Sequence, residues 1–131
     1  MISGNKCYSP RLSGYYLANN WRVGFEAERD AVGGRILGNY VEKAGTEGVH
    51  VQWYIADTLV KGNTVVRTFN HNYGVYDSRG VTVTENVGRS PGTGRNPGPA
   101  WCHLKIENSR VVESKNNFYY RGATRPKICS L

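Results

Sequence analysis

The sequence is poor in cysteine, long apolar stretches and helical periodicity, and each shortage excludes a class of protein. Its three cysteines are an odd number without Cys-x-x-Cys spacing, which argues against a zinc site and implies no disulfide framework. No apolar run reaches the ~18 residues that a membrane span needs, and the first residues contain no signal-peptide core. The best helical candidate, residues 15–28, is interrupted by Asn19, Asn20 and Gly24. A chain of 131 residues with this composition predicts one all-β domain, residues 1–131.

Acidic residues are also scarce. The chain contains 10 Asp and Glu residues and 17 Lys and Arg residues, so its formal net charge is +7. This balance favours an anionic partner such as an acidic glycan, an anionic surface or a nucleic acid. The basic residues are scattered without a Lys/Arg run, which also fits an ordinary solvated surface. No nucleic-acid recognition motif is present, which argues against that partner.

A hydrophobic-x-Gly-Asn-x-hydrophobic motif recurs along the chain. The Asn position of the motif is occupied by Asn5, Asn39 and Asn63, and by Asn86 and Ser109 in two less exact copies. These positions follow one another at intervals of 34, 24, 23 and 23 residues. A fixed period in this range is typical of solenoid folds, in which each turn buries its apolar face against the next. Because Asn tolerates left-handed backbone and forms local hydrogen bonds, we expect these side chains to stack as a corner ladder. Cys7 shares a slot with valines, which indicates a small core residue.

A second element alternates with the first. Short strand-like segments start at Gly24, Gly48 and Gly74, with a looser echo at Gly98, at spacings of 24, 26 and 24 residues. Two stretches interrupt the pattern: residues 8–22 lengthen the first turn, and residues 88–99 are expected to form a protruding loop. The tail from 116 to 131 is expected to cap the last turn.

These motifs, from Ile2 to Val112, resemble the repeat of the right-handed parallel β-helix, or pectate-lyase-like, superfamily. The resemblance implies a right-handed parallel β-helix solenoid of about five turns. Members of this superfamily include pectate and alginate lyases, mannuronan epimerases, polygalacturonases and phage tailspikes, and most act on or bind polysaccharides, often acidic ones. The resemblance therefore implies an extracellular, cell-surface or virion location. The chain begins inside a repeat, which suggests a fragment of a longer helix.

Alternation along the Gly-led strands sorts their side chains by face. One face, expected to point inward, holds Phe25, Val49, Val75, Ala27, Val51 and Asp77. The opposite face is expected to carry one column of Glu26, His50 and Tyr76, and beside it a column of Glu28, Gln52 and Ser78.

An acid, an imidazole and a phenol on one outer face fit elimination or epimerisation at a uronic acid. Tyr76 and His50 could supply the base and the acid, while Arg29 or Arg79 could neutralise the substrate carboxylate. The pair Glu26 and Glu28 could instead serve hydrolysis. Sugar contact without catalysis and a plain solvated face are the alternatives.

Two further residues are candidates for sugar contact. Trp53 occupies the same position of the repeat as Arg29 and Arg79. If its indole is exposed, it would offer a flat surface on which a sugar ring could stack. Mannuronan epimerases carry a Tyr-Gly-Phe-Asp-Pro-His motif, to which the segment from Tyr73 to Val75 is similar in its first three places. The resemblance implies a catalytic Tyr73, although the Pro-His pair of the motif is missing. No spaced cluster of His or Asp predicts a metal or another cofactor.

Two functions remain open. The first is a lyase or epimerase that acts on an acidic polysaccharide. The second is a non-catalytic, tailspike-like or adhesin-like glycan-binding module, in which the first turn would pack in a homotrimer or against a missing N-terminal portion.

Overall fold

The computed structural model describes residues 1–8, 15–18, 31–52, 55–92, 101–120, 123–124 and 128–130. Within these ranges every regular element is a strand, and no helix is long and apolar enough to cross a membrane. The predictions that fall on Glu26, Glu28, Arg29 and Trp53 lie outside the described residues.

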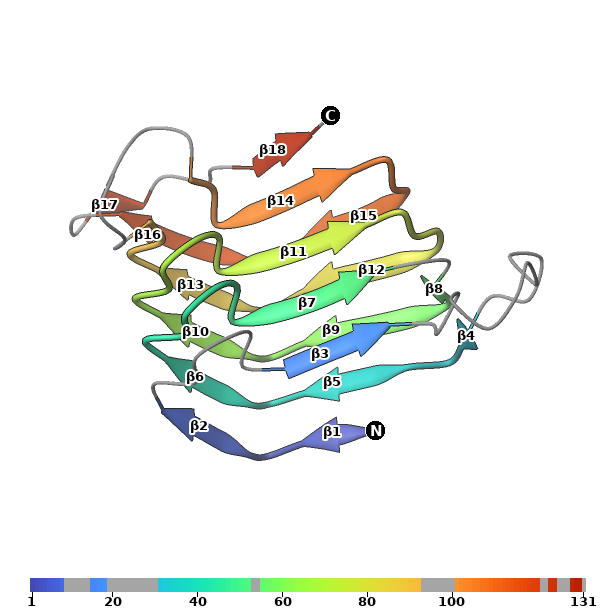
Figure 1. The fold of residues 1–131 in the computed structure, drawn as a ribbon, viewed down its shortest axis with the longest axis horizontal. Helices are drawn as coiled ribbons and strands as arrows, with labels where there is room; N and C mark the ends of the chain where they lie inside the picture. The colour runs from blue at the N-terminus through green and yellow to red at the C-terminus, as the bar shows by residue number, and fades with distance from the viewer. Residues whose placement is uncertain are drawn as a thin grey trace.

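Three parallel sheets carry the fold (Figure 1). Sheet A contains β1 (Ile2–Ser3), β5 (Arg35–Leu37), β9 (Thr58–Lys61), β12 (Val81–Thr84) and β15 (Val111–Ser114). Sheet B contains β2 (Lys6–Tyr8), β6 (Tyr40–Glu42), β10 (Thr64–Val66), β13 (Val87–Arg89) and β16 (Asn117–Tyr120), with β17 (Ala123–Thr124) antiparallel at its edge. Sheet C contains β3 (Tyr15–Ala18), β7 (Val49–Gln52), β11 (Tyr73–Tyr76), β14 (Leu104–Glu107) and β18 (Ile128–Ser130). A small pair, β4 (Ala31–Val32) and β8 (Ile55–Ala56), lies between sheets C and A in chain order.

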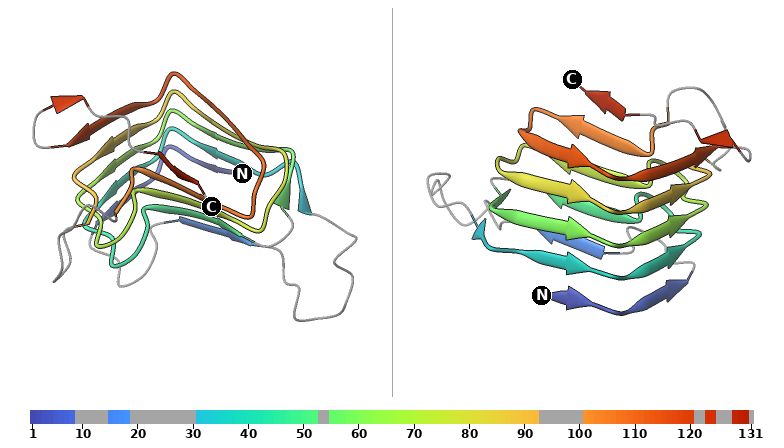
Figure 2. Two further views of the ribbon diagram at one scale, coloured as in Figure 1. Left: turned by 90° about the horizontal axis from the view of Figure 1, so that it is seen from above. Right: turned by 180° about the vertical axis from the view of Figure 1, so that it is seen from behind.

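The chain passes through sheets A, B and C in that order and then returns to sheet A beside its previous strand. Seen from above, each turn runs counter-clockwise while it rises toward the viewer, so the coil is right-handed (Figure 2). The described strands make about five such turns, and the predicted parallel β-helix is confirmed.

The predicted Asn ladder occupies the corner between sheets A and B. Asn39 Oδ1 accepts the backbone N–H of Asn5 at 3.0 Å, Asn63 Oδ1 accepts that of Asn39 at 2.9 Å, and Asn86 Oδ1 accepts that of Asn63 at 3.0 Å. Each side-chain amide also bonds the amide oxygen one turn above. The Asn side chains thus provide hydrogen-bond partners for buried backbone groups that a tight bend would otherwise leave unpaired.

The fifth member of the ladder is Asn116, and the prediction of Ser109 in that slot is wrong. Asn116 Oδ1 accepts the backbone N–H of Asn86 at 2.9 Å. Ser109 instead lies at the corner after β14, where its Oγ accepts the backbone N–H of Ser78 at 3.0 Å. The residue before each ladder Asn is left-handed, and at Glu85 and Lys115, both with φ 55°, it is no longer the glycine that marks the earlier turns. The last two repeats therefore carry a weaker sequence signal.

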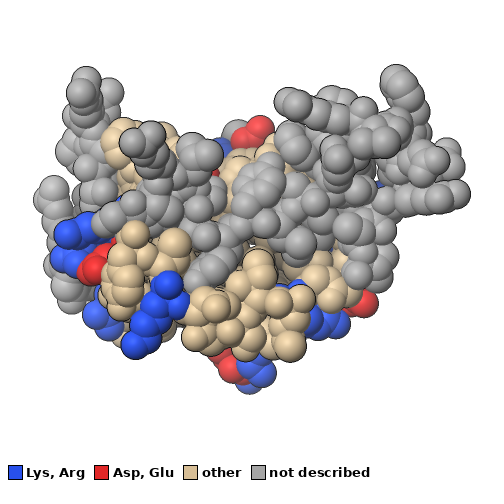
Figure 3. Space-filling model, turned by 60° about the horizontal axis from the view of Figure 1, so that its bottom comes forward, with Lys and Arg blue, Asp and Glu red and all other residues tan. Residues whose placement is uncertain are grey.

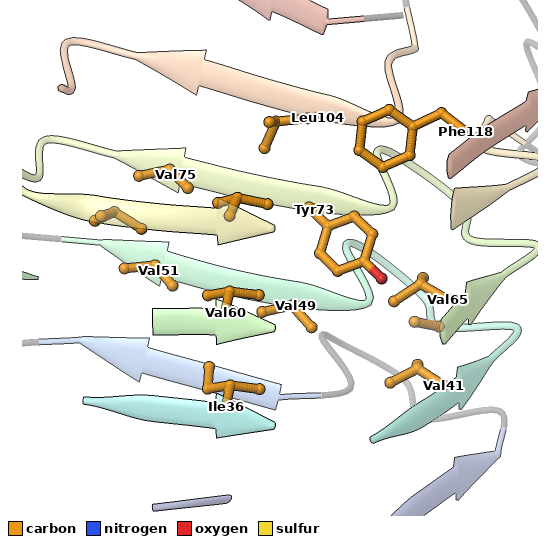
Figure 4. Packing of buried hydrophobic residues seen from close by; sticks show 13 residues of the cluster. Ile36, Val41, Val49, Val51, Val60, Val65, Tyr73, Val75, Leu104 and Phe118 are labelled. Atoms are coloured by element: carbon orange, nitrogen blue, oxygen red, sulfur yellow. The ribbon is translucent and has the colours of Figure 1, made fainter. Parts of the chain in front are cut away.

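Inward-facing aliphatic side chains stack from turn to turn and fill the space between the three sheets (Figure 4). The fully buried members include Val41 and Val65 from sheet B, and Val51 and Val75 from sheet C. Cys7 pairs with Val41 and packs partly buried against this core, as predicted. The core consists largely of β-branched residues, which suit a pleated surface that is covered on one side.

One glycine makes room for a large core residue. Gly88 points inward in β13, where an added Cβ would lie 2.9 Å from a ring carbon of Phe118. The absent side chain therefore lets the Phe118 ring settle into the core above it. The strand also corrects the predicted loop at 88–99, because Gly88 and Arg89 belong to β13, while residues 93–100 lie outside the described residues.

The end of the chain continues the helix more than it caps it. β16 and β18 extend sheets B and C by one strand each. A disulfide joins Cys102, just before β14, to Cys129 in β18, with their Cα atoms 6.0 Å apart. The odd cysteine count had implied no such bridge, and Cys7 is the free thiol.

The ladder makes a direct stability prediction. Asn63→Leu should lower the free energy of unfolding by about 1–3 kcal/mol, because the backbone N–H of Asn39 and the carbonyl of Ile36 lose buried partners. Asn117→Leu is the matched control, since Asn117 is exposed in β16 and is not part of the ladder. Urea denaturation of both variants measures the difference. Equal stabilities would mean that the ladder bonds are not needed.

Candidate functional site

The outer face of sheet C carries the predicted His50 and Tyr76, but not in the predicted register. His50 is paired with Gly74, and Tyr76 is paired with Gln52. The alignment of Gly48 with Gly74 was therefore wrong by two residues. On the other side of His50 the paired residue is Tyr16 of β3 rather than the predicted Glu26. His50 and Tyr76 nevertheless lie on one face, as alternation predicted.

The absence of a side chain at Gly74 allows the rings of His50 and Tyr76 to contact each other. A Cβ at Gly74 would lie 2.5 Å from the Tyr76 ring, so the ring leans over the empty position beside His50. The centroids of the His50 and Tyr76 rings are 4.8 Å apart, with 32° between the planes. The contact thus forms diagonally across two strands rather than directly between paired residues.

Glu47 completes this group and was missed by the sequence reasoning. It lies just before β7 and is only 6% exposed. One carboxylate oxygen accepts the Tyr76 hydroxyl at 3.0 Å, and the other lies 3.2 Å from His50 Nδ1. His50 Nε2 lies 2.8 Å from Gln52 Oε1. We call Glu47, His50, Gln52 and Tyr76 the sheet C cluster.

The cluster has a defined charge pattern. Burial disfavours the charged form of Glu47, but the hydrogen bond and charge of His50, with a further hydrogen bond from Tyr76, outweigh it and lower the pKa of Glu47. Burial, and then the negative charge of Glu47, raise the pKa of Tyr76 far above its usual value. Tyr76 therefore remains a neutral hydrogen-bond donor at physiological pH. In this state it is a proton donor, whereas the sequence suggested Tyr76 as the base.

Two other predicted site residues in the described ranges, Tyr73 and Arg79, are not part of this cluster. Tyr73 is 1% exposed, and its hydroxyl lies 2.7 Å from the carbonyl oxygen of Val87, inside the core. The side chain is therefore a core residue and does not reach the outer face of sheet C, and the same burial raises the pKa of its hydroxyl well above the usual value. Arg79 is exposed at the corner between sheets C and A.

Two residues after β11 correct the predicted faces. Ser78 was expected outside but is 1% exposed, and its hydroxyl donates to the carbonyl of Tyr76 at 2.8 Å. Asp77 was expected inside but lies at a left-handed corner with φ 46°, where its carboxylate accepts the Asn108 amide at 2.8 Å. Strand alternation ends at Tyr76, and positions beyond it follow the corner geometry instead.

A different surface combines aromatic and basic side chains: the outward side of sheet B. One outward row contains Lys6 and Tyr40, and the neighbouring row contains Tyr8, Glu42, Val66, Arg89 and Tyr119. We call these seven residues the sheet B face. Figure 3 shows several basic side chains on the left, the side on which β2 and β6 lie in Figure 1, with others at the bottom and on the right of the view.

The aromatic residues of the sheet B face are supported by neighbours. Tyr8 is 59% exposed and packs beside Tyr40, with 5.8 Å between ring centroids. The Arg89 guanidinium lies 5.3 Å from the ring centroid of Tyr119. Such contacts hold a guanidinium over a ring while leaving its donors available to a ligand. The sequence signal for this face was weak, because its seven residues come from five different turns.

A hollow of about 310 Å³ adjoins the sheet B face at the corner that follows β6 and β10. It is lined by Lys43, Ala44, Gly45, Arg67 and Phe69. Among the described residues, no group of three or more His, Cys, Asp and Glu side chains could hold a metal ion.

Comparison with protein-family models, with curated proteins and with solved structures gives no match for this chain.

The sheet C cluster predicts a pH dependence. Because the pKa of Glu47 is lowered in the folded state, its ionisation stabilises the fold above the ordinary pKa of 4.5, and this contribution is lost as the pH falls below that value. Glu47→Gln should therefore destabilise the protein at pH 7 by about 1–3 kcal/mol, and by less at pH 3.

Glu85→Gln is the control, since the Glu85 side chain is 46% exposed and its ion pair with Lys61 is a surface contact. Denaturation curves at both pH values give the comparison. A Glu47→Gln penalty that does not change with pH would contradict the assigned charge pattern.

Proposed function

We propose that this protein is a glycan-binding β-helix module that holds an acidic polysaccharide along the sheet B face. The observation that carries the proposal is the combination of outward-facing tyrosine rings, of which Tyr8 is exposed and Tyr40 and Tyr119 are half-buried, with basic groups on one parallel sheet. Tyrosine presents a rigid ring with a polar edge, which suits the mixed apolar and hydroxyl surface of a sugar. The basic groups suit the negative charge of an acidic glycan.

The geometry of the sheet supports a polymer over a small ligand. Parallel strands repeat every ~4.8 Å, so equivalent outward positions recur along the axis at a regular spacing. Tyr8, Arg89 and Tyr119 all belong to one outward row. An extended chain that runs along this row would meet several of these side chains in succession. The disulfide between Cys102 and Cys129 is compatible with the oxidising, extracellular setting in which such polymers occur.

Arg89 provides the test of this proposal. Arg89→Gln should weaken binding of a long polyuronate by about fivefold, because one charged contact is lost. Arg110→Gln is the control, since Arg110 is equally basic and exposed but lies at the corner between sheets C and A. Both variants should keep the wild-type melting temperature.

The measurement is isothermal titration calorimetry with polyuronate and with a neutral polysaccharide at two salt concentrations. Binding to the charged polymer alone, weaker at high salt, is the expected result. Equal losses in the Arg89 and Arg110 variants would show general charge attraction and would contradict a site on sheet B.

A second candidate function, a lyase or epimerase acting on uronic acids, is favoured by the sheet C cluster. Tyr76 has the protonation state required to donate to a leaving oxygen, and His50 lies against it. Lys105, paired with Gly74 beside this cluster, could neutralise a substrate carboxylate. The polar groups of the cluster also bond to one another, however, which suits a purely structural network as well.

The two functions can be separated by product formation. If the sheet C cluster is catalytic, wild-type protein at high concentration should generate unsaturated sugar ends, measured by ultraviolet absorbance, or epimerised units, measured by NMR. His50→Gln should abolish that product while leaving polymer binding intact. No product from any polyuronate, together with intact binding, would leave the non-catalytic module as the function.

A further inference from the structure

The hollow beside sheet B combines a cationic rim with an apolar wall. Phe69 is 44% exposed, although most large apolar side chains described here are buried. The neighbouring Ala44 and Gly45 carry little or no side chain, which leaves about 310 Å³ of space against the ring. Lys43 and Arg67 stand on the same hollow. A ligand that fits must offer a flat apolar surface and a negative charge together.

The backbone places the two cationic residues at equivalent corners of successive turns. Lys43 and Arg67 both adopt left-handed conformations, with φ of 57° and 55°. Their backbone N–H groups donate to Val66 and Arg89 at 2.9 Å each, so each corner is bonded to the next turn. Two bonded corners of the same shape on successive turns therefore place these side chains at equivalent positions, one turn apart.

The local charge suits a single negative group. The Arg67 guanidinium pairs with Glu42, while Lys43 makes no ion pair with any residue in the described ranges. Two cations and one carboxylate leave one net positive charge at the rim. A carboxylate matches this charge better than a doubly charged phosphate ester does.

We propose that this hollow is a subsite for one uronic acid unit, with the sugar carboxylate bound by Lys43 and one face of the ring packed on Phe69. The inference rests on the proposed function, because the unit would belong to the same acidic polymer that lies along the sheet B face. Arg67 then orients the bound unit through its remaining donors while Glu42 holds its guanidinium in place.

The experiment uses the intact chain and a polyuronate trisaccharide as the probe. Lys43→Gln should weaken trisaccharide binding about fivefold to tenfold, because the carboxylate loses its charged partner. Phe69→Ala should weaken it by about tenfold, because the ring loses its apolar wall. Calorimetry measures both, and thermal melting should be unchanged because both side chains are exposed.

Each variant has a matched control. Lys115 is an exposed lysine with φ 55° at the corner between sheets A and B, so Lys115→Gln repeats the backbone setting of Lys43 at a distant position. Val112 is 61% exposed on sheet A, so Val112→Ala removes apolar surface away from the hollow. Both controls should bind the trisaccharide like the wild type.

Three outcomes would overturn the subsite. Unchanged trisaccharide binding by Lys43→Gln and Phe69→Ala, with the long polymer still dependent on Arg89, would remove the subsite and leave the proposed function standing. Equal binding of a carboxyl-reduced trisaccharide would show that the carboxylate is not recognised. Tighter, Lys43-dependent binding of an oligothymidylate would assign the hollow to nucleic acid instead.

A fourth outcome concerns the function as a whole. If the wild-type protein binds no acidic polymer of any length, the proposed function fails, and this subsite fails with it.

Discussion

The corner ladder of asparagine side chains is the interaction on which the rest of the structure depends. Each ladder Asn bonds the backbone and the side chain of its neighbour, so it fixes both the height and the register of successive turns. Register decides which outward residues become neighbours, since a shift of one residue would exchange the inner and outer faces of a strand. The aromatic and basic rows of sheet B follow directly from this corner, because β2, β6, β10, β13 and β16 each begin one residue after a ladder Asn.

The two outer surfaces differ in how their polar groups are used. On sheet C, Glu47 is bonded to both His50 and Tyr76, which turns these side chains toward one another. On sheet B, Tyr8 and Arg89 are exposed and pack beside the rings of Tyr40 and Tyr119. Groups that are already satisfied contribute little to ligand binding, whereas supported but exposed groups can exchange water for a ligand at small cost. This contrast favours the proposed glycan site on sheet B over one on sheet C.

Much of the fold could be predicted from the sequence because its strongest signals are local. The Gly-Asn pairs at Asn39 and Asn63 combine a left-handed residue with a corner amide, and both lie in the ladder. The Gly-Asn motif did not identify Asn116, because Lys115 precedes it in place of the glycine. Ser109 also fits the regular interval between the Asn positions better than Asn116 does. The disulfide depends on the distance between Cys102 and Cys129 in space, which spacing along the sequence does not provide.

The candidate site was harder to predict, because the same residue type serves different purposes in neighbouring turns. Gly48 precedes β7, where a Cβ would lie 2.2 Å from Val65, while Gly74 lies within β11 beneath the Tyr76 ring. Aligning these two glycines shifted the expected partner of His50. Glu47 belongs to no repeated motif, so the periodicity of the sequence could not identify it. Its importance comes from its burial and from its hydrogen bond with Tyr76, 29 residues away.

The most direct measurement is an NMR titration of the ¹⁵N-labelled protein with a polyuronate oligosaccharide. If the glycan lies along sheet B, the amide signals of β2, β6, β13 and the corner at Lys43 should shift, while those of His50 and Tyr76 remain in place. Shifts confined to β7 and β11, with sheet B unaffected, would contradict the choice of surface and assign the ligand to the sheet C cluster.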